Sequence, residues 1–497
     1  MKKKIFRPGR TSENLSGYLI LIVFLSIFGH IPQVNAQGDS PYSEVRGLID
    51  LRSGFSDGAH DIEELIRLAS SRGFKVLFIN DHNRISISYG LPPFRRIFKY
   101  TKEYPSIATH GAANYLNAIN VAASKHPDTI LIPGCLTSPF YFWTGSWLKK
   151  DLTLNEYDRK ILILNFERPE DYEGIPSISS GFSLRYTKEL LPGLTLFLVP
   201  FVIGLIFLRW RGMYRRMGVI IIIVAALAIV DYNPFRGSRY HPYGGDQGIG
   251  PFQEVIDYVN ERGGYSFWNY PEQRSGIRRH GPVNVRTPPY PQVLTESTDY
   301  TGFAAIYGDR ITVTDPGHEW DRVLNEFCRG DRKRAPWAIS TADFHEEGRW
   351  GLKLGAYPTT FLVRDFSKSA VLEALEKGRM YSSRSDGHKW PRLDYFYVSS
   401  SRSGRAYMGE TLVTPTFPLI RLKVSYYPET IAPVTLLLIR GGKLIKEFSG
   451  KTPMEVEVLD KKILPGRKTF YRVIDKKKHL TSNPIFVTYR GPGPSTR

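Results

Sequence analysis

The strongest constraint on the fold is a pair of apolar blocks in the middle of the chain. The first covers residues 190–208, and the second reads MGVIIIIVAALAIV at residues 217–230. The first block is long enough to cross a bilayer as a helix. The second gives only about 20 Å of helix and crosses a bilayer only if flanking residues extend it. Two buried core helices are the alternative, but the second block has no polar face to turn to solvent. We therefore predict a transmembrane helical hairpin at residues 186–234.

The segment between the two blocks is strongly basic. It contains four arginines, Arg209, Arg211, Arg215 and Arg216. Basic loops stay on the cytoplasmic side of a membrane, so this turn is predicted to be cytoplasmic and both ends of the hairpin to emerge outside.

The N-terminal residues resemble an export signal. MKKKIFRPGR is basic, GYLILIVFLSIFG is a short apolar core, and VNA ending at Ala36 fits a small-x-small cleavage site. Residues 1–36 are thus either a cleaved signal peptide or an uncleaved N-terminal anchor. Both alternatives place the chain from Gln37 onward on the extracytoplasmic side, and together with the hairpin they predict a membrane protein.

The composition indicates a folded protein with an anionic neighbour. The chain has 497 residues, enough for two or three domains with full cores, and a net charge of +19. Because export argues against nucleic acid, the lipid bilayer surface is the expected partner. The two cysteines, Cys135 and Cys328, make no disulfide framework, although one bridge between them is left open.

Apolar strands alternate with amphipathic helices on both sides of the hairpin, over residues 37–185 and 235–390. After the strand VRGLID, Asp61 is predicted to cap a helix with Glu64 in capping-box position, and Gly73 to end it. Strands such as VLFI, ILIP, KILIL and WAIS are mostly apolar. This pattern predicts an α/β fold with a parallel sheet covered by helices, either open or closed into a barrel.

The pattern changes near residue 391. LDYFYVSS, LIRLKVSYY, VTLLLIR and TFYRVID read as strands, and Gly441-Gly442 as a hairpin turn. We predict a C-terminal β-sandwich at residues 391–497, with a structural or contact role.

Polar residues that suit metal binding follow two of the predicted strands. VLFI is followed by Asn80, Asp81 and His82, and WAIST by the segment that contains Asp343 and His345. In α/β barrels and open sheets, chemistry gathers at the carboxyl ends of the strands. Mixed imidazole and carboxylate pairs suit Zn²⁺, Mn²⁺ or Fe²⁺, although such a pair can also simply cap a loop.

Taken in order, these motifs resemble the PHP superfamily, named for its polymerase and histidinol phosphatase domains. The resemblance covers residues 44–383, interrupted by the hairpin. It rests on FSDG, NDHN, ILIPG, GGYSFWNYPE, and AISTADFHEEGRWG with its sequel VLEALEKGRMYSS. The resemblance implies a distorted (β/α)7 barrel and phosphoester hydrolysis with up to three metal ions.

The chain departs from the family pattern at several ligand positions. The family's first motif carries His-x-His, where Asp50 and Arg52 stand here. A Glu after the third strand's Pro-Gly is replaced by Cys135-Leu136, and a His at the start of the fourth strand by Lys160. The His-Pro after the fifth strand reads Tyr270-Pro271. The remaining candidate metal ligands are Asp57, Asp81, His82, Asp343 and His345.

Five candidate ligands can hold one divalent ion but hardly a cluster of two or three. We expect Arg52 and Lys160 to replace the lost ions as fixed cations and to pair with Asp50, Asp57, Asp81 and Asp343. The favoured function is a membrane-tethered, exported binding or scaffold protein with a degenerate metal site and an anionic or phosphorylated ligand. The alternative is a residual metal-dependent phosphoesterase with one Zn, Mn or Fe ion. A transporter is disfavoured, since the hairpin interior has no acidic residue.

Overall fold

The computed structural model describes residues 40–491 apart from 274–275, 310, 350–351 and 386–388. The predicted signal peptide or anchor at residues 1–36 lies outside the described residues. Residues Tyr42–Arg497 form one unit by their internal contacts.

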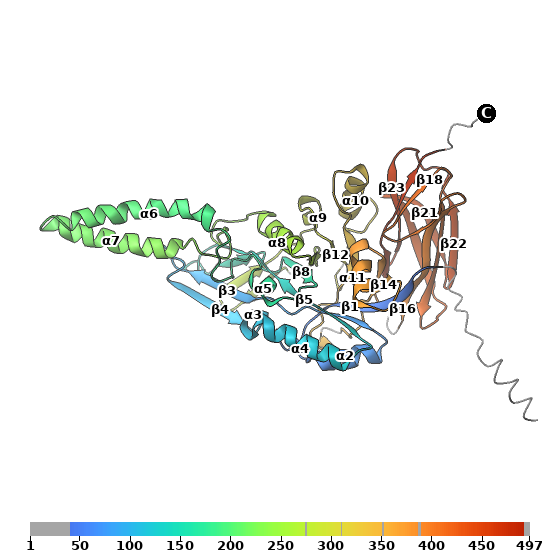
Figure 1. The fold of residues 1–497 in the computed structure, drawn as a ribbon, viewed down its shortest axis with the longest axis horizontal. Helices are drawn as coiled ribbons and strands as arrows, with labels where there is room; N and C mark the ends of the chain where they lie inside the picture. The colour runs from blue at the N-terminus through green and yellow to red at the C-terminus, as the bar shows by residue number, and fades with distance from the viewer. Residues whose placement is uncertain (1–39, 274–275, 310, 350–351, 386–388, 492–497) are drawn as a thin grey trace, which may run out of the picture. The chain divides into compact units, whose positions relative to one another are not determined.

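A mixed α/β region with a curled half-barrel sheet occupies the chain on both sides of the two apolar blocks (Figure 1). Its strands run in the order β13-β12-β9-β8-β5-β2-β1-β14-β15. They are β1 (Ser43–Leu51), β2 (Val76–Ile79), β5 (Ile130–Thr137), β8 (Lys160–Leu164), β9 (Tyr265–Asn269), β12 (Gly302–Ile306), β13 (Trp337–Ser340), β14 (Thr359–Val363) and β15 (Met380–Ser383). Most are buried along their whole length, which explains why their sequences are continuously apolar rather than alternating.

Amphipathic helices accompany this sheet. They are α2 (Ile62–Ser71), α4 (Ala112–Lys125), α8 (Gly250–Glu261), α10 (Glu319–Arg329) and α11 (Lys368–Lys377). The predicted capping box of α2 is confirmed, because the Glu64 amide donates to Asp61 (2.7 Å) and the Asp61 amide donates to Glu64 (3.2 Å). The predicted apolar face is buried in the core.

The prediction of a parallel sheet is wrong at β8 and at β14, which runs antiparallel to β1 and β15. Strands β1, β2 and β5 are parallel, as are β9, β12 and β13, but β8 runs antiparallel to both β5 and β9. No helix lies between β5 and β8 to carry the chain back to the other edge, so β8 enters from the edge where β5 ends. As a result Lys160, the first residue of β8, lies in register with Asn269, the last residue of β9.

The segment after β13 is hydrogen-bonded to the end of β1. The Arg52 amide donates to the Phe344 carbonyl (2.9 Å), and the Phe344 amide donates to the Asp50 carbonyl (3.2 Å). These bonds place Asp343 and His345 beside the end of β1. We call the edge where β1, β2, β9 and β13 end the mouth.

Short helices and strands lie in the connections between the main strands. They are β3 (Ile85–Gly90), β4 (Lys99–Tyr104), β6 (Phe142–Thr144), β7 (Thr153–Asn155), β10 (Ile277–His280), β11 (Val283–Arg286), α3 (Ile107–His110), α5 (Pro169–Glu173) and α9 (Val293–Glu296). Strands β3 and β4 pair as a hairpin, and β10-β11-β7-β6 form a small sheet.

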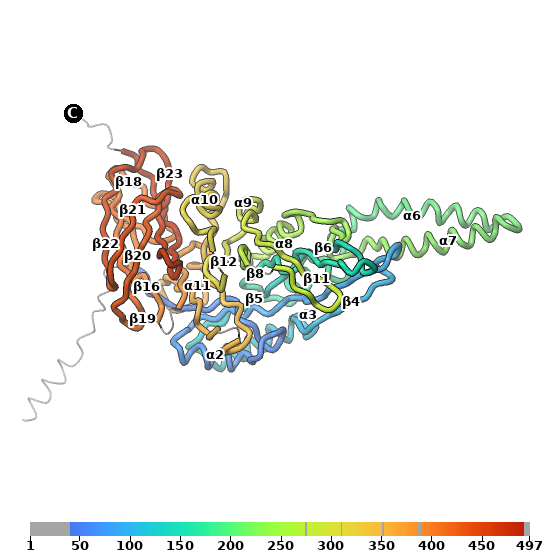
Figure 2. Tube along the Cα trace, turned by 180° about the vertical axis from the view of Figure 1, so that it is seen from behind, coloured from blue at the N-terminus to red at the C-terminus, as the bar shows by residue number. Residues whose placement is uncertain are grey.

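The apolar blocks form two antiparallel helices, α6 (Thr187–Phe207) and α7 (Met213–Tyr232), which run side by side (Figures 1 and 2). Both are long and apolar enough to cross a membrane. Large apolar side chains such as Leu196 (72% exposed) and Ile220 (61%) face outward, so the alternative of two buried core helices is wrong. The helices meet at two glycines, because a Cβ on Gly204 would lie 3.1 Å from the Gly218 carbonyl oxygen.

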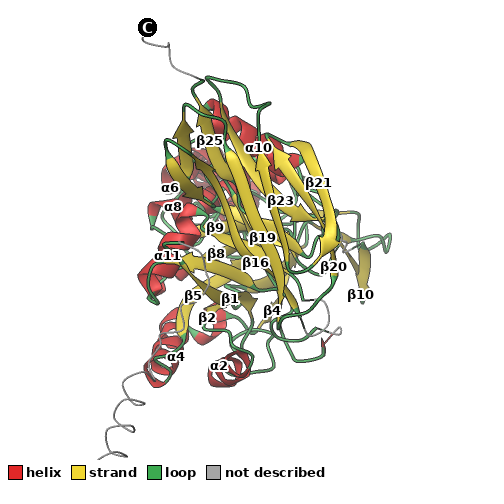
Figure 3. Ribbon diagram, turned by 90° about the vertical axis from the view of Figure 1, so that its right-hand side faces the viewer, coloured by secondary structure: helices red, strands yellow, loops and turns green. Residues whose placement is uncertain are grey.

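The C-terminal part contains two sheets. Strands β16 (Trp390–Ser400), β17 (Gly404–Tyr407), β19 (Leu419–Tyr427) and β22 (Met454–Leu459) form one sheet. The others are β18 (Thr411–Thr414), β20 (Pro433–Arg440), β21 (Lys443–Lys451), β23 (Lys468–Asp475), β24 (Leu480–Ser482) and β25 (Ile485–Tyr489). Buried side chains of both sheets form one cluster, and the strands are seen together in Figure 3. The turn at Gly441-Gly442 joins β20 to β21 as predicted.

The sequence did not indicate how closely this part joins the half-barrel. Strand β24 pairs with β15, so the second C-terminal sheet continues the curled sheet. In addition, Arg472 on β23 and Asp321 on α10 form a fully buried ion pair (2.7 Å). A separate sandwich domain at residues 391–497 therefore stays a prediction.

Candidate functional site

The predicted site residues come together at the mouth from five segments. Asp50 and Arg52 lie at the end of β1, and Asp57 in the loop that follows. Asp81 and His82 follow β2, Asp343 and His345 follow β13, and Lys160 begins β8.

Arg52 lies at the centre of this group and is completely buried. Its Nη1 donates to Asp50 Oδ1 (2.5 Å) and to the Asn80 carbonyl, and its Nη2 donates to Asp343 Oδ1 (3.0 Å). Its Nε lies 3.9 Å from Asp57 Oδ1 and has no hydrogen-bond partner among the described residues. The guanidinium group thus joins three carboxylates from different segments.

The electrostatic surroundings keep Arg52 charged. Burial alone lowers the pKa of its guanidinium group, but Asp50 and then Asp343 raise it by more, so the net shift is upward. An arginine does not lose its proton in a protein, so this positive charge is permanent.

Asp50 also binds polar groups at the end of β9. Its Oδ2 accepts a hydrogen bond from Asn269 Nδ2 (2.9 Å) and one from the Tyr270 hydroxyl. Its own amide donates to Asn80 Oδ1 (3.1 Å). Tyr270 stands where the resembled family has a histidine, and its hydroxyl binds a carboxylate.

Asp57 faces two imidazoles. His345 Nε2 lies 3.1 Å and His82 Nε2 lies 3.7 Å from Asp57 Oδ2. Burial raises the pKa of Asp57, but the hydrogen bond to His345 and the charge of Arg52 help to lower it by more, so it stays ionised. His345 Nδ1 donates to the Asp343 carbonyl (2.6 Å), which fixes the orientation of the ring.

His82 is close to Asp57 and also to the two cations Lys160 and Arg52. Burial lowers its pKa well below the usual range, and Lys160 and Arg52 lower it further. The ring is therefore neutral at physiological pH.

The expected pairing of Asp81 with a cation is not found. Its carboxylate accepts hydrogen bonds from the Ser53 amide (2.8 Å), the Ser53 hydroxyl (2.6 Å) and the Ser56 hydroxyl (2.6 Å). Burial raises its pKa to about 6, even though these hydrogen bonds act in the opposite direction. Asp81 is thus satisfied by neutral donors from the loop after β1.

Lys160 also differs from expectation. Among the described residues, none of the carboxylates lies within ion-pair distance of its ammonium group, although its charge reaches His82. Lys160 is half-buried at the mouth. Of the two cations proposed to replace metal, only Arg52 has carboxylate partners in this described part of the chain.

The backbone of the site is strained at three points. Asp50, Tyr270 and Asp343 have positive φ angles of 73°, 50° and 48°. The left-handed region is uncommon for residues other than glycine, and it costs of order 1–3 kcal/mol each unless the surroundings enforce it. Here the contacts of Asp50 and Arg52 enforce it, as is typical of sites that aim side chains at one another.

Sequence reasoning missed Ser53, Ser56, Asn269 and the hydroxyl role of Tyr270. Asn269 ends β9 and Tyr270 follows it directly, so the rule that located Asp81 and Asp343 at strand ends could have found them. The two serines lie in a loop, and their contacts depend on how that loop folds.

The fit of this site to a metal ion can be judged from its donor groups. Asp57, His82 and His345 offer one carboxylate and two imidazoles, which is suitable chemistry. However, the described residues contain no group of three or more such side chains arranged to hold a metal. Asp57 Oδ2 lies at hydrogen-bonding distance from His345, and Arg52 lies on the other side of that carboxylate. As arranged, these residues do not fit a metal ion.

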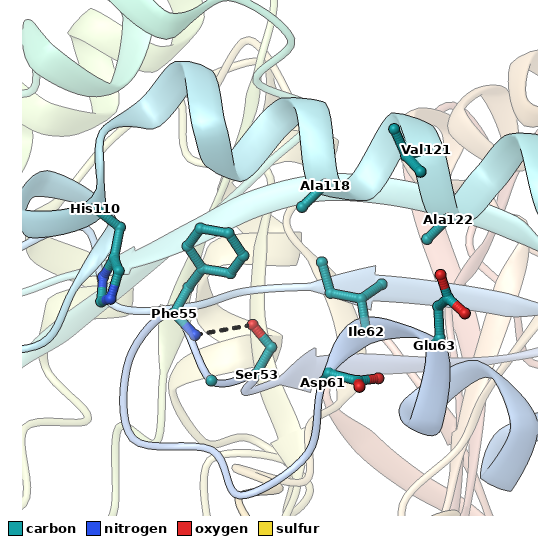
Figure 4. Close-up of a pocket in the computed structure, with 10 residues that line it drawn as sticks. Ser53, Phe55, Asp61, Ile62, Glu63, His110, Ala118, Val121 and Ala122 are labelled. Carbon is teal, nitrogen blue, oxygen red and sulfur yellow. Dashed lines mark hydrogen bonds between the residues drawn. The ribbon is translucent and has the colours of Figure 1, made fainter.

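A separate hollow lies behind the loop after β1, between α2 and α4 (Figure 4). It is lined by Phe55, Ile62, Ala118 and Ala122, with a volume of about 370 Å³. Of its acidic residues, Asp61 caps α2. It touches the site only through Ser53, whose hydroxyl also accepts from the Phe55 amide (3.3 Å).

No family model and no curated protein matches the chain. It is similar to a two-domain protein of Bacteroides vulgatus with a predicted PHP-like metal-dependent phosphoesterase, at 11% identity and a TM-score of 0.35, over 87% of this chain and 91% of that one. It is also similar to a candidate metal-dependent phosphoesterase of Bifidobacterium adolescentis, at 14% identity and a TM-score of 0.28, over 62% and 91% of the two chains. An amidohydrolase of Chromobacterium violaceum, solved with sulfate and without metal, has 13% identity, a TM-score of 0.26 and coverages of 61% and 88%.

These similarities are too distant to assign an activity. One of the three proteins is described as PHP-like, and two are described as metal-dependent phosphoesterases.

Proposed function

We propose that this protein is a membrane-tethered, exported member of the PHP type in which a fixed arginine has replaced the metal ions, and that its mouth binds an anionic ligand without hydrolysing it. Residues 37–185 and 235–390 would form the distorted (β/α)7 barrel of that type. Residues 186–234 would anchor it in the bilayer.

The observation that supports a charge-substituted site is the buried guanidinium of Arg52 among Asp50, Asp343 and Asp57. A divalent ion beside these carboxylates would stand within a few ångströms of a permanent positive charge. At an effective dielectric constant of about 20, two unit charges 4 Å apart interact by about 4 kcal/mol, and a divalent ion doubles this repulsion. Arginine and metal therefore compete for the same carboxylates.

The observation that supports an anionic ligand is the positive charge of Lys160 at the mouth. Lys160 has no carboxylate within ion-pair distance among the described residues, so its ammonium group is available to a ligand. His82 beside it is neutral and can accept or donate one hydrogen bond. A phosphate group suits such a pair.

The membrane tether is supported by the apolar surface of α6 and α7. Large exposed apolar surfaces of this kind do not persist in water. Strand β8 precedes this pair of helices and β9 follows it, yet the two strands pair with each other. Both parts of the barrel must therefore lie on the same side of the membrane, with an even number of crossings between them.

The convergence of Asp57, His82 and His345 favours one second candidate, a residual phosphoesterase with one Zn, Mn or Fe ion. It would require Asp57 to exchange its hydrogen bond with His345 for a bond to metal. Because the three residues as arranged do not fit the ion, the hydrolytic step of this candidate lacks a supporting geometry.

An assay of hydrolysis separates the two candidates. We expect the full-length protein in detergent to hydrolyse p-nitrophenyl phosphate and its diester no faster than His345→Ala, with Zn²⁺, Mn²⁺ or Fe²⁺ added to both. His345→Ala is the matched control because it removes one imidazole and leaves Arg52 and its carboxylates in place. A metal-dependent rate that the wild type has and His345→Ala lacks would favour the phosphoesterase.

A further inference from the structure

A second basic site lies where the apolar helices join the half-barrel. A cavity of about 510 Å³ opens between the β3–β4 hairpin and the segments just before α6 and just after α7. Arg95, Arg96 and Lys99 line it from the β3–β4 hairpin, and Arg236 and His241 line it from the segment after α7. It is distinct from the mouth, since it contains none of the residues discussed there.

The cations of this cavity have no carboxylate partners of their own. Among the described residues, none of Arg95, Arg96, Lys99 and Arg236 forms a side-chain ion pair. The nearby Asp231 carboxylate is occupied, because it accepts the main-chain amides of Arg96 (2.6 Å) and Ile97 (3.3 Å). The buried Nε of Arg236 also has no hydrogen-bond partner in the described part of the chain.

Burial and mutual repulsion lower the pKa values of two of these groups. Burial, followed by the charge of Arg236, lowers the pKa of Arg96 to about 10. Burial, followed by the charges of Arg96 and Arg236, lowers the pKa of His241 to about 4. A cluster of this kind is stabilised when an anion enters it.

The arginines differ in how they are held. Arg96 Nη1 donates to the Tyr232 carbonyl (2.7 Å) at the end of α7, so this arginine ties the hairpin to the barrel. The Cζ of Arg95 lies over the ring of Tyr243 (4.0 Å), and that of Arg236 lies near the ring of Tyr232 (5.8 Å). A cation–π contact uses no N–H donor, and a guanidinium group has five, so donors remain for a phosphate.

We propose that this cavity binds the phosphate of an anionic lipid headgroup, with Arg95 and Arg236 as the two binding residues. The proposal rests on α6 and α7 crossing the membrane, as in the proposed function. A lipid rather than a free phosphate ester fits the walls, because Phe182 before α6 and Phe235 after α7 also line the cavity. Their rings stack 5.8 Å apart, and Phe182 is 76% exposed. Aromatic side chains where helices leave a bilayer lie at headgroup level.

The test uses the full-length protein in a non-ionic detergent and short-chain phosphatidylglycerol as the probe. Short-chain phosphatidylcholine tests the need for net negative charge, and glycerol phosphate tests whether a free anion suffices. We expect phosphatidylglycerol to bind at saturation more tightly than either. Arg95→Gln and Arg236→Gln are each expected to weaken this binding about fivefold, the usual effect of one basic residue at a membrane surface.

Arg239→Gln is the matched control. It removes the same charge three residues from Arg236, but Arg239 pairs with Glu254 (2.6 Å) and Glu189 (3.3 Å) and does not line the cavity. Thermal melts of all three variants check that each is folded. We expect binding by Arg239→Gln to equal that of the wild type.

Three outcomes would overturn the proposal. They are equal binding of the two lipids, glycerol phosphate binding as tightly as phosphatidylglycerol, and equal losses in Arg239→Gln and Arg236→Gln. Because binding in detergent does not depend on orientation in a membrane, a failure here is distinguishable from a failure of the predicted topology, which cysteine labelling of cells measures.

Discussion

Replacing Arg52 with alanine is expected to lower the free energy of unfolding by about 3–5 kcal/mol, the usual cost of removing one partner from a buried ion pair. The change leaves Asp50 completely buried without its cation and releases Asp343 from a 3.0 Å ion pair. It also removes the side chain that joins the end of β1 to the segment after β13. Thermal and denaturant unfolding of the full-length protein in detergent would measure the loss.

Arg84→Ala is the matched control for this experiment. Arg84 pairs with Glu103 (2.8 Å) near the surface, where such a pair is worth at most about 1 kcal/mol. If Arg52→Ala is no more destabilising than Arg84→Ala, Arg52 does not hold the site together.

Cysteine labelling is expected to give an all-or-none result for the two ends of the apolar helices. In intact cells, an impermeant thiol reagent should label Leu184→Cys, before α6, and should not label Met213→Cys, at the start of α7. Both side chains are well exposed in the wild type, at 65% and 75%, so burial within the protein does not decide the outcome. The membrane alone would protect Met213→Cys, because the four arginines hold that turn in the cytoplasm.

Two controls accompany this experiment. The native cysteines should react little, because Cys135 is buried and burial raises the pKa of Cys328 to about 11. Permeabilised cells should label Met213→Cys. Labelling of Met213→Cys in intact cells would contradict the predicted topology.

Local features of the fold and the parallel direction of most of the half-barrel strands could be predicted from the sequence, whereas the direction of β8 could not. The capping box of Asp61 and Glu64, the buried face of α2 and the turn at Gly441-Gly442 depend on neighbours within a few residues, and all three are confirmed. The direction of β8 depends on the path between β5 and β8, which an apolar run such as KILIL does not record. The pairing of β15 with β24 joins residues about a hundred positions apart, which periodicity does not report.

The candidate site divides in the same way. Strand-end reasoning collected Asp81, His82, Asp343 and His345, because the ends of neighbouring strands meet at one edge of a sheet. The hydrogen-bond donor that each carboxylate binds was harder to predict from the sequence. Asp81 binds serine hydroxyls instead of a cation, since this depends on the fold of one loop. The metal-binding and charge-replacing roles of these residues stay predictions.

The most direct measurement of whether Arg52 stands in for a metal ion is elemental analysis of the purified full-length protein, beside melts with and without chelator. We expect Zn, Mn and Fe each well below one per chain, and an unchanged melting temperature after chelation. Stoichiometric metal that is lost in His82→Ala and His345→Ala, together with a melting temperature that falls on chelation, would contradict charge replacement and restore the phosphoesterase.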